Sequence, residues 1–232
     1  SLMKSVGITA LALRAFLESP EKYNEADGAF VTRQVDFLLS HAKPDGSISA
    51  SLQSTAYNTA VALNALAATK NPKHAAVIEA GRKFLAKHQI DEEEGYKPDH
   101  RYYGGIGYGG GERPDLSNLY VSLEGLKAAA TDPKDPVWQK ALTFINRVQN
   151  RSESNDQKFA GNDGGFMYLP GQNPPEYENE TASYGGMTAA GLLSLLFAGV
   201  DKKDPRVQAA YKWMTTNYTL DTNPGTNKKH GL

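Results

Sequence analysis

Pairs of helix-like segments recur along the chain at a nearly constant spacing, and this constrains the fold more than any other feature. The first, mostly small and apolar, segments align on Thr9, Thr59, Leu119 and Thr188. The amphipathic segments that follow align on Phe37, Phe84, Phe144 and Trp213, at separations of 28, 25, 25 and 25 residues. A recurrent spacing of this kind is typical of repeat proteins, whose units bury their apolar faces against one another. The sequence therefore predicts one helical hairpin used four times.

The expected helices are bounded by proline, glycine or a capping aspartate. They cover 6–17, 31–39, 54–66, 75–89, 116–130, 136–149, 186–199 and 205–217. Asp135 and Asp204 each precede a proline at the first helical position, where its missing N–H costs nothing. No stretch alternates with period two, so we expect almost no sheet. We predict a single all-α domain over 1–232, with repeats at 5–48, 54–108, 116–168 and 184–225.

Composition excludes several functional classes. The 232 residues carry 25 basic and 26 acidic side chains, a net charge of −1, so no overall field attracts nucleic acid. The absence of cysteine removes thiolate nucleophiles and cysteine-ligated zinc. No apolar run approaches the roughly 20 residues of a membrane-spanning helix, so we expect a soluble protein without a transmembrane segment. The abrupt helical start suggests an exported protein whose signal segment was removed; the sequence sets neither compartment nor oligomeric state.

A cluster of glycine and tyrosine at 102–111 interrupts the helices near the middle of the chain. The pattern recurs at 163–168 and at 184–187, and a weaker version occurs at 45–48. Glycine tolerates positive φ and allows backbones to approach closely, and a flanking aromatic can fill a pocket. We therefore predict tight turns that join the helices.

The second and third repeats carry a more specific pattern. Residues 80–89 and 141–149 each place an aromatic five residues before a glutamine. The first leads to a glycine–aromatic turn at Gly95–Tyr96 or at Gly105–Tyr108, and the second leads to one at Asp163–Phe166. These segments resemble the glutamine–aromatic repeats of the prenyltransferase and squalene oxidase repeat superfamily, which includes terpenoid cyclases and protein prenyltransferase β subunits. Ala42 and Tyr218 replace the glutamine in the first and fourth repeats.

The resemblance implies an α/α toroid, with inner helices ringed by outer helices and a cavity that opens at the glycine turns. Four hairpins imply an open ring or a longer natural chain. Within the superfamily, the nearest likeness is to bacterial repeat proteins of unassigned activity.

The catalytic motifs of the superfamily are missing. No Asp-x-Asp-Asp motif occurs, and the Asp/Cys/His zinc set lacks its cysteine. The five histidines have no ligand spacing, so we expect neither metal nor cofactor; only Asp99-His100, beside the glycine cluster, forms a pair of interest. The acidic run 91–94 is expected to be a solvated loop. Gly105-x-Gly107-x-x-Gly110 matches a dinucleotide fingerprint but follows no strand.

What remains is a set of residues at or near the turns, which we predict to line a ligand site. Their side chains could hold an isoprenoid, stabilise a cation or stack on sugar rings, although aromatics beside glycine turns also plug helix ends. The predicted ligand-binding residues are Tyr57, Asn58, Tyr102, Tyr103, Tyr108, Asn118, Tyr120, Phe166, Tyr168 and Tyr184, with Tyr177 in the same group.

Three functions are open at this point. The first is binding of an isoprenoid or glycan, or scaffolding, without catalysis. The second is isoprenoid cyclisation or transfer, with Asp163 as the candidate acid because it leads the best-formed turn. The third is a polysaccharide lyase or binder on an α/α barrel, which would direct Arg101 and Arg113 into the mouth. A dry aromatic lining favours an isoprenoid, a polar lining with arginine and carboxylates favours a sugar, and a collapsed centre favours scaffolding.

Overall fold

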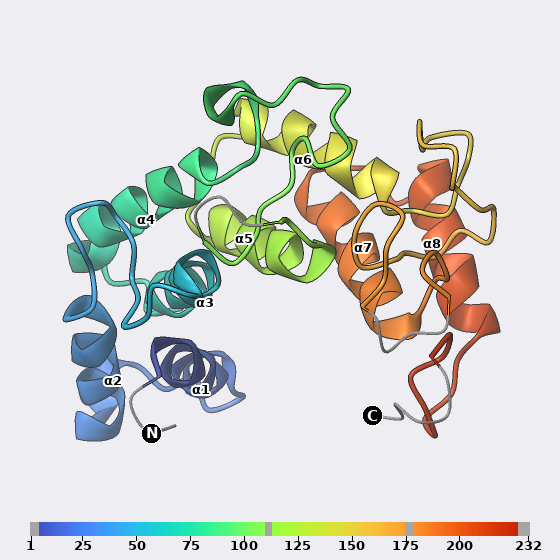
Figure 1. Cartoon of the computed structure of the whole chain (residues 1–232). Helices are drawn as coiled ribbons and strands as arrows, with labels where there is room; N and C mark the ends of the chain where they lie inside the picture. The colour runs from blue at the N-terminus through green and yellow to red at the C-terminus, as the bar shows by residue number, and fades with distance from the viewer. Residues whose placement is uncertain (1–4, 110–112, 175–178, 227–232) are drawn as a thin grey trace. The chain divides into compact units, whose positions relative to one another are not determined.

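The computed structural model describes residues 5–109, 113–174 and 179–226, and within these ranges the chain is helical (Figure 1). Short 3-10 helices occur at η2 (Glu25–Asp27), η3 (Pro72–His74) and η4 (Glu92–Glu94), and strand pairing is limited to isolated bridges. The all-α class is confirmed, whereas the toroid stays a prediction. The α-helices of these ranges are α1 (Val6–Glu18), α2 (Ala29–Leu39), α3 (Thr55–Ala68), α4 (Ala75–Lys87), α5 (Leu116–Ala128), α6 (Pro136–Arg147), α7 (Gly185–Phe197) and α8 (Pro205–Thr216).

Some residues of the sequence predictions lie outside the described ranges. These are Gly110 and Gly111 of the glycine cluster and Tyr177.

The predicted aspartate caps are confirmed at two helix starts. Asp135 Oδ1 accepts a hydrogen bond from the Val137 N–H at 3.0 Å. Asp204 Oδ1 accepts one from the Arg206 N–H at 2.9 Å. In both helices a proline occupies the first position, as the sequence indicated.

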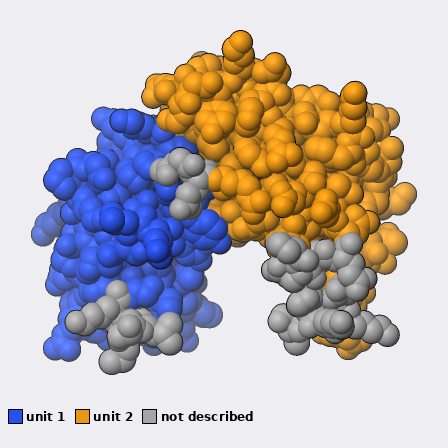
Figure 2. All heavy atoms as spheres, in the orientation of Figure 1, with its two compact units in different colours: residues 1–88, 107–112, 121–132 blue, residues 89–106, 113–120, 133–232 orange. Residues whose placement is uncertain are grey.

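The described residues form two compact units (Figure 2). Of the described residues, the first unit comprises 5–88, 107–109 and 121–132, and the second comprises 89–106, 113–120, 133–174 and 179–226. In the first unit α1 packs against α2 and α3, and α3 packs against α4. In the second unit α7 packs against α6 and α8. The single domain over 1–232 stays a prediction.

Burial separates the two kinds of helix that the sequence distinguished. Residues 59–66 of α3 are all buried, whereas α4 buries only Gly81, Phe84 and Leu85. Small residues let the enclosed helix approach its neighbours: a Cβ on Gly125 of α5 would lie 2.9 Å from the Ala60 carbonyl oxygen of α3. A mostly apolar helix is therefore enclosed, and an amphipathic helix covers it from one side.

Candidate functional site: the glycine turns and the α8 groove

Three glycine turns share one backbone geometry, and each docks on the outer helix of the following repeat. Their central glycines have φ of +91°, +84° and +86°, values that favour glycine. A Cβ at these positions would lie 2.3, 1.8 and 2.8 Å from a backbone oxygen of α4, α6 and α8. Both the conformation and the close approach require glycine. The glycine and oxygen pairs are Gly46 with Ala80, Gly104 with Lys140, and Gly164 with Ala209.

The two glutamines that carry the family resemblance bind these turns to the same helices. Gln89 Nε2 donates to the carbonyls of Gly104 and Val137, both at 3.0 Å. Gln149 Nε2 donates to the carbonyls of Gly164 at 3.0 Å and Arg206 at 2.9 Å. Both glutamines are buried. Each amide therefore joins its turn to the first helical turn of the next outer helix.

The inner helix holds the same turn through a threonine hydroxyl. Thr59 Oγ1 accepts the Ile48 N–H at 2.9 Å, and Thr188 Oγ1 accepts the Phe166 N–H at 3.1 Å. Each hydroxyl also donates to the carbonyl four residues earlier in its own helix, at 2.7 and 2.9 Å. Thr59 and Thr188, aligned from sequence spacing alone, therefore occupy equivalent positions.

Asp163, the candidate acid, fixes the third turn. Its Oδ1 accepts the Gly165 N–H at 2.9 Å and the Ser183 hydroxyl at 2.7 Å. In the first turn Asp45 accepts the Ser47 N–H at 2.9 Å and the Ser47 hydroxyl at 2.8 Å. The Ser47 N–H and hydroxyl hold the pKa of Asp45 below its usual value. Asp163 is therefore equivalent to Asp45, which has a structural role in the first turn. Unlike a purely structural group, Asp163 is also exposed at the rim of a groove.

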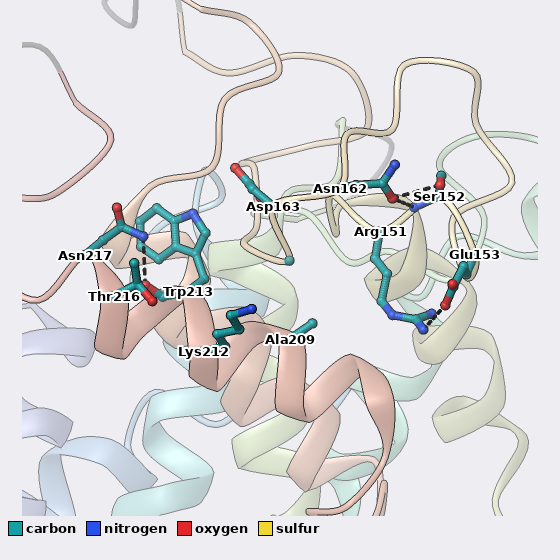
Figure 3. Close-up of a pocket in the computed structure, with 11 residues that line it drawn as sticks. Arg151, Ser152, Glu153, Asn162, Asp163, Ala209, Lys212, Trp213, Thr216 and Asn217 are labelled. Carbon is teal, nitrogen blue, oxygen red and sulfur yellow. Dashed lines mark hydrogen bonds and ion pairs between the residues drawn. The ribbon is translucent and has the colours of Figure 1, made fainter.

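We name this the α8 groove: a depression of about 730 Å³ between the third turn and α8 (Figure 3). Arg151 and Glu153 form an ion pair within it. The groove combines charges of both signs with hydroxyls, amides and an indole, a set suited to a ligand rich in hydroxyl groups. It is lined by Arg151, Ser152, Glu153, Asn162, Asp163, Gly164, Ala209, Lys212, Trp213, Thr216 and Asn217.

Local hydrogen bonds shape both sides of the α8 groove. The Ser152 N–H and hydroxyl donate to Asn162 Oδ1 at 3.0 and 2.8 Å, closing the loop onto itself. On the helix side, Asn217 Nδ2 donates to the Trp213 carbonyl at 2.8 Å, satisfying the end of α8. Of the lining residues only Asp163 was among the predicted site residues. Trp213 had served as a repeat marker, and its place beside a charged loop depends on contacts distant in sequence.

Several predicted ligand-binding residues are packed or bonded within the protein. Phe166 is fully buried, and a Cβ on Gly191 would lie 2.4 Å from its ring. Tyr184 is also buried. Tyr103 is buried and its hydroxyl donates to Glu92 at 2.8 Å; burial and this hydrogen bond raise its pKa. Asn118 is buried and donates to Asp115 at 2.7 Å.

The other predicted residues reach the surface to different extents. Tyr108 is 40% exposed, and Asn58 donates to the Ser49 hydroxyl at 3.0 Å. Both lie in the first unit, as does Tyr57. Their convergence with the residues of the second unit on one ligand stays a prediction. The partly exposed tyrosines are Tyr57, Tyr102, Tyr120 and Tyr168.

The two arginines of the polysaccharide hypothesis have different surroundings. The Arg101 guanidinium lies 4.6 Å from the Tyr102 ring centroid, and its Nη2 donates to the Tyr102 hydroxyl at 2.6 Å. Arg101 also lines a pocket of about 660 Å³ with His100 and Asp99. Arg113 is exposed and donates to Gln172 at 3.3 Å. Arg101 therefore has a pocket beside it, and Arg113 contacts a neighbouring loop.

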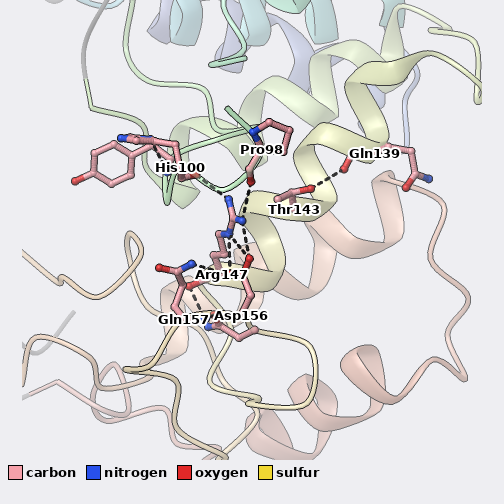
Figure 4. Close-up of polar contacts among 9 residues, drawn as sticks. Pro98, His100, Gln139, Thr143, Arg147, Asp156 and Gln157 are labelled. Carbon is pink, nitrogen blue, oxygen red and sulfur yellow. Dashed lines mark hydrogen bonds and ion pairs between the residues drawn. The ribbon is translucent and has the colours of Figure 1, made fainter. Parts of the chain in front are cut away.

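A buried arginine that the sequence did not single out joins the two long loops of the second unit (Figure 4). Arg147 donates to the Pro98 carbonyl at 2.8 Å, to the His100 carbonyl at 2.7 Å and to Asp156 Oδ2 at 2.6 Å. Hydrogen bonding by Arg147 lowers the pKa of Asp156. Arg147 thus supports the loop that carries His100 and Arg101.

The acidic run differs in part from the expected solvated loop. Glu92, Glu93 and Glu94 are exposed in η4. Asp91 is buried, and Lys140 Nζ lies 2.6 Å from its Oδ2. The difference arises because Lys140 of α6, 49 residues away in sequence, forms an ion pair with Asp91.

In the ranges that the structure describes, no group of three or more histidine, aspartate or glutamate side chains is placed to hold a metal ion. No helix within those ranges combines the length and apolar character needed to cross a bilayer. No protein-family model and no curated protein matches the chain.

Proposed function

We propose that this chain is a binding protein of the prenyltransferase and squalene oxidase repeat type, and that the α8 groove holds a glycan. The observation that carries the proposal is the lining of the groove, where Lys212 of α8 lies across from a loop that bears Arg151 and Asp163. Sugars offer hydrogen-bond donors and acceptors for such groups.

The isoprenoid alternatives gain less support from these contacts. Phe166 and Tyr184 are buried by their own protein, which leaves fewer aromatic faces for an apolar ligand. An acid that starts alkene cyclisation must donate a proton into an apolar cavity. Asp163 accepts hydrogen bonds from the Gly165 N–H of its own turn and from the Ser183 hydroxyl, and it borders a polar groove. Binding without catalysis therefore agrees best with the geometry.

The test is a screen on a glycan array, followed by calorimetry with the best glycan and with farnesol as an isoprenoid probe. Lys212→Ala removes a groove cation, and we expect at least about tenfold weaker glycan binding, the loss of one charged hydrogen bond. Lys203→Ala removes the same charge from an exposed turn outside the groove lining and serves as the matched control. Equal affinities of the two variants, or binding of farnesol alone, would refute the glycan proposal.

A further inference from the structure

The second unit has a further pocket that shares no lining residue with the α8 groove. Its volume is about 660 Å³, and we call it the loop pocket. One wall comes from the connection between α4 and α5, and the other comes from the connection between α6 and α7. The side chains that line the loop pocket are those of Tyr96, Lys97, Asp99, His100, Arg101 and Gln157.

The buried guanidinium of Arg147 holds both walls of the loop pocket (Figure 4). It donates to the carbonyls of Pro98 and His100 in the first wall, at 2.8 and 2.7 Å. It also donates to Asp156 Oδ2 at 2.6 Å, and Asp156 Oδ1 accepts a hydrogen bond from Gln157 Nε2 at 2.7 Å in the second wall. Walls that are fixed before a ligand arrives lose less conformational entropy on binding.

The imidazole of His100 is held within the first wall. Its ring centroid lies 4.7 Å from that of Tyr96 and 5.5 Å from that of Tyr102, with an edge-to-face arrangement in both pairs. Nδ1 accepts the Tyr102 N–H at 3.3 Å, so Nε2 carries the proton of the neutral ring. The nitrogen of His100 that is left for a ligand is therefore a hydrogen-bond donor.

The charged groups of the loop pocket have no internal counter-ions. Lys97 and Arg101 are cations and Asp99 is an anion, and none of the three forms an ion pair within the residues that the structure describes. Gln157 uses its amide nitrogen to bind Asp156, which leaves its Oε1 as an acceptor. The pocket thus offers two cations and an imidazole donor together with two acceptors.

This combination of groups discriminates between classes of anion. A carboxylate can pair with Lys97 and with the planar guanidinium of Arg101. Asp99 repels an anion that has no donor of its own, such as acetate or the phosphate dianion, but it accepts a hydrogen bond from a hydroxyl. We propose that the loop pocket binds a sugar acid, a ligand that carries a carboxylate beside hydroxyl groups.

The proposal goes beyond the glycan of the α8 groove, because it concerns a different set of residues and an anionic class of sugar. A free sugar acid and a uronate unit of a polysaccharide present the same carboxylate and hydroxyls. Both sources are therefore included in the experiment.

The test is a titration of the full chain followed by the backbone amide NMR signals of 95–101, which lie in the first wall. The probes are sodium glucuronate, sodium galacturonate, glucose, sodium acetate and inorganic phosphate. We expect at least one of the two sugar acids to bind about tenfold or more tightly than glucose, which lacks the charge-assisted hydrogen bonds of the carboxylate. It should also bind more tightly than acetate and phosphate, which bring no hydroxyl to Asp99.

Three variants connect binding to individual side chains. Arg101→Gln should weaken binding of the sugar acid about tenfold, whereas Arg33→Gln, at an exposed position of α2, is the matched control and should leave it unchanged. Asp99→Asn removes the like charge, so acetate and phosphate should bind about two- to fivefold more tightly and the preference for the sugar acid over acetate should narrow. Lys212→Ala alters the α8 groove alone and should not change binding in the loop pocket.

The same titrations can overturn the proposal. It is wrong if neither sugar acid shifts the signals of 95–101, if acetate or phosphate binds as tightly as the sugar acids, or if Arg101→Gln and Arg33→Gln have equal affinities. Tetragalacturonate compared with galacturonate, per sugar unit, separates the two sources. Tighter binding of the tetramer supports a sugar acid within a polysaccharide, and equal binding supports the free acid.

Discussion

Replacing Gln149 by methionine tests whether the glutamine of the repeat is a structural tie. Methionine keeps nearly the volume of glutamine but has no donor, so the change removes hydrogen bonds with little cavity formation. The Gly164 carbonyl loses its side-chain donor inside the protein, at a cost of about 1–3 kcal/mol. Loss of the hydrogen bond to the Arg206 carbonyl lowers the free energy of unfolding by only about 0.5–1.5 kcal/mol, because this carbonyl lies in α8 and also accepts an intrahelical hydrogen bond.

One feature of Gln149 acts in the opposite direction. Its Oε1 is buried without a hydrogen-bond partner in the described protein. Removing that oxygen relieves about 1 kcal/mol of unsatisfied polarity. We therefore expect a net destabilisation of about 2 kcal/mol for Gln149→Met.

Urea unfolding measures this difference in free energy. Both tryptophans, Trp138 and Trp213, lie in the second unit together with Gln149, so their fluorescence reports that unit while circular dichroism reports the whole chain. Gln139→Met, at an exposed position of α6, is the matched control and should leave the midpoint unchanged. Ordinary surface substitutions change the free energy of unfolding by up to about 0.5 kcal/mol. If the free energy of unfolding of Gln149→Met lies within that range of the unaltered protein, the Gln149 side chain does not stabilise the docked turn.

Three further changes test the turns and the contacts of Arg147. Gly104→Ala should cost about 3 kcal/mol or more, since its Cβ would lie 1.8 Å from a backbone oxygen of α6; Gly199→Ala, with a similar φ of +80° but no atom within 4 Å, should cost about 1 kcal/mol. Thr188→Val should cost about 1–3 kcal/mol, because the Phe166 N–H loses its acceptor. Arg147→Met should cost about 2 kcal/mol, since the carbonyls of Pro98 and His100 lose their side-chain donor while the exposed Asp156 carboxylate stays solvated. Urea midpoints measure all three.

The ion pair also sets a pH dependence with a definite sign. Hydrogen bonding by Arg147 lowers the pKa of Asp156 in the folded protein, so its stabilisation is complete above the unfolded pKa of about 3.9 and is lost as pH falls through the folded value. Asp156→Asn should flatten the stability profile below about pH 4, where the carboxyl of the unfolded chain titrates. An unchanged stability profile at acid pH would contradict this assignment.

Thr143→Val, which removes a hydroxyl bonded only to its own helix, is the neutral control for Thr188→Val.

The helices were predictable because their limits depend on local chemistry. Asp135 and Asp204 cap helices that begin at proline, and this needs no knowledge of the rest of the chain. The equivalence of Thr59 and Thr188 was also contained in the spacing, because a repeated backbone puts repeated residues in repeated surroundings. Their hydrogen-bond partners were not predictable, since Thr188 binds an N–H 22 residues away through a turn of unknown path.

The candidate site was harder to predict, because it depends on how long loops fold. Asp163 was selected for its place before a glycine turn, and its exposure on the α8 groove could not be read from that position. Lys140 and Asp91 are 49 residues apart and meet only because the loop returns to α6. Arg151 and Lys212 are ordinary surface charges in sequence, and folding brings both to one groove.

The way in which the turns dock explains why grooves form beside the long loops. A docked turn is held by its glycine backbone, by a helix carbonyl and by a side-chain amide or hydroxyl. The residues between the glutamine and the glycine make none of these contacts, so their number and identity are free to vary. Gly104 follows Gln89 by 15 residues and Gly164 follows Gln149 by 15, whereas Gly46 follows Ala42 by four. Asp45 and Asp163 fix equivalent turns, yet only Asp163 borders a groove of the long-loop kind, because residues 151–162 supply its opposite wall. Shortening 151–162 to the length of the first turn should therefore abolish glycan binding while the glycine turn remains docked, which separates the ligand site from the scaffold that carries it.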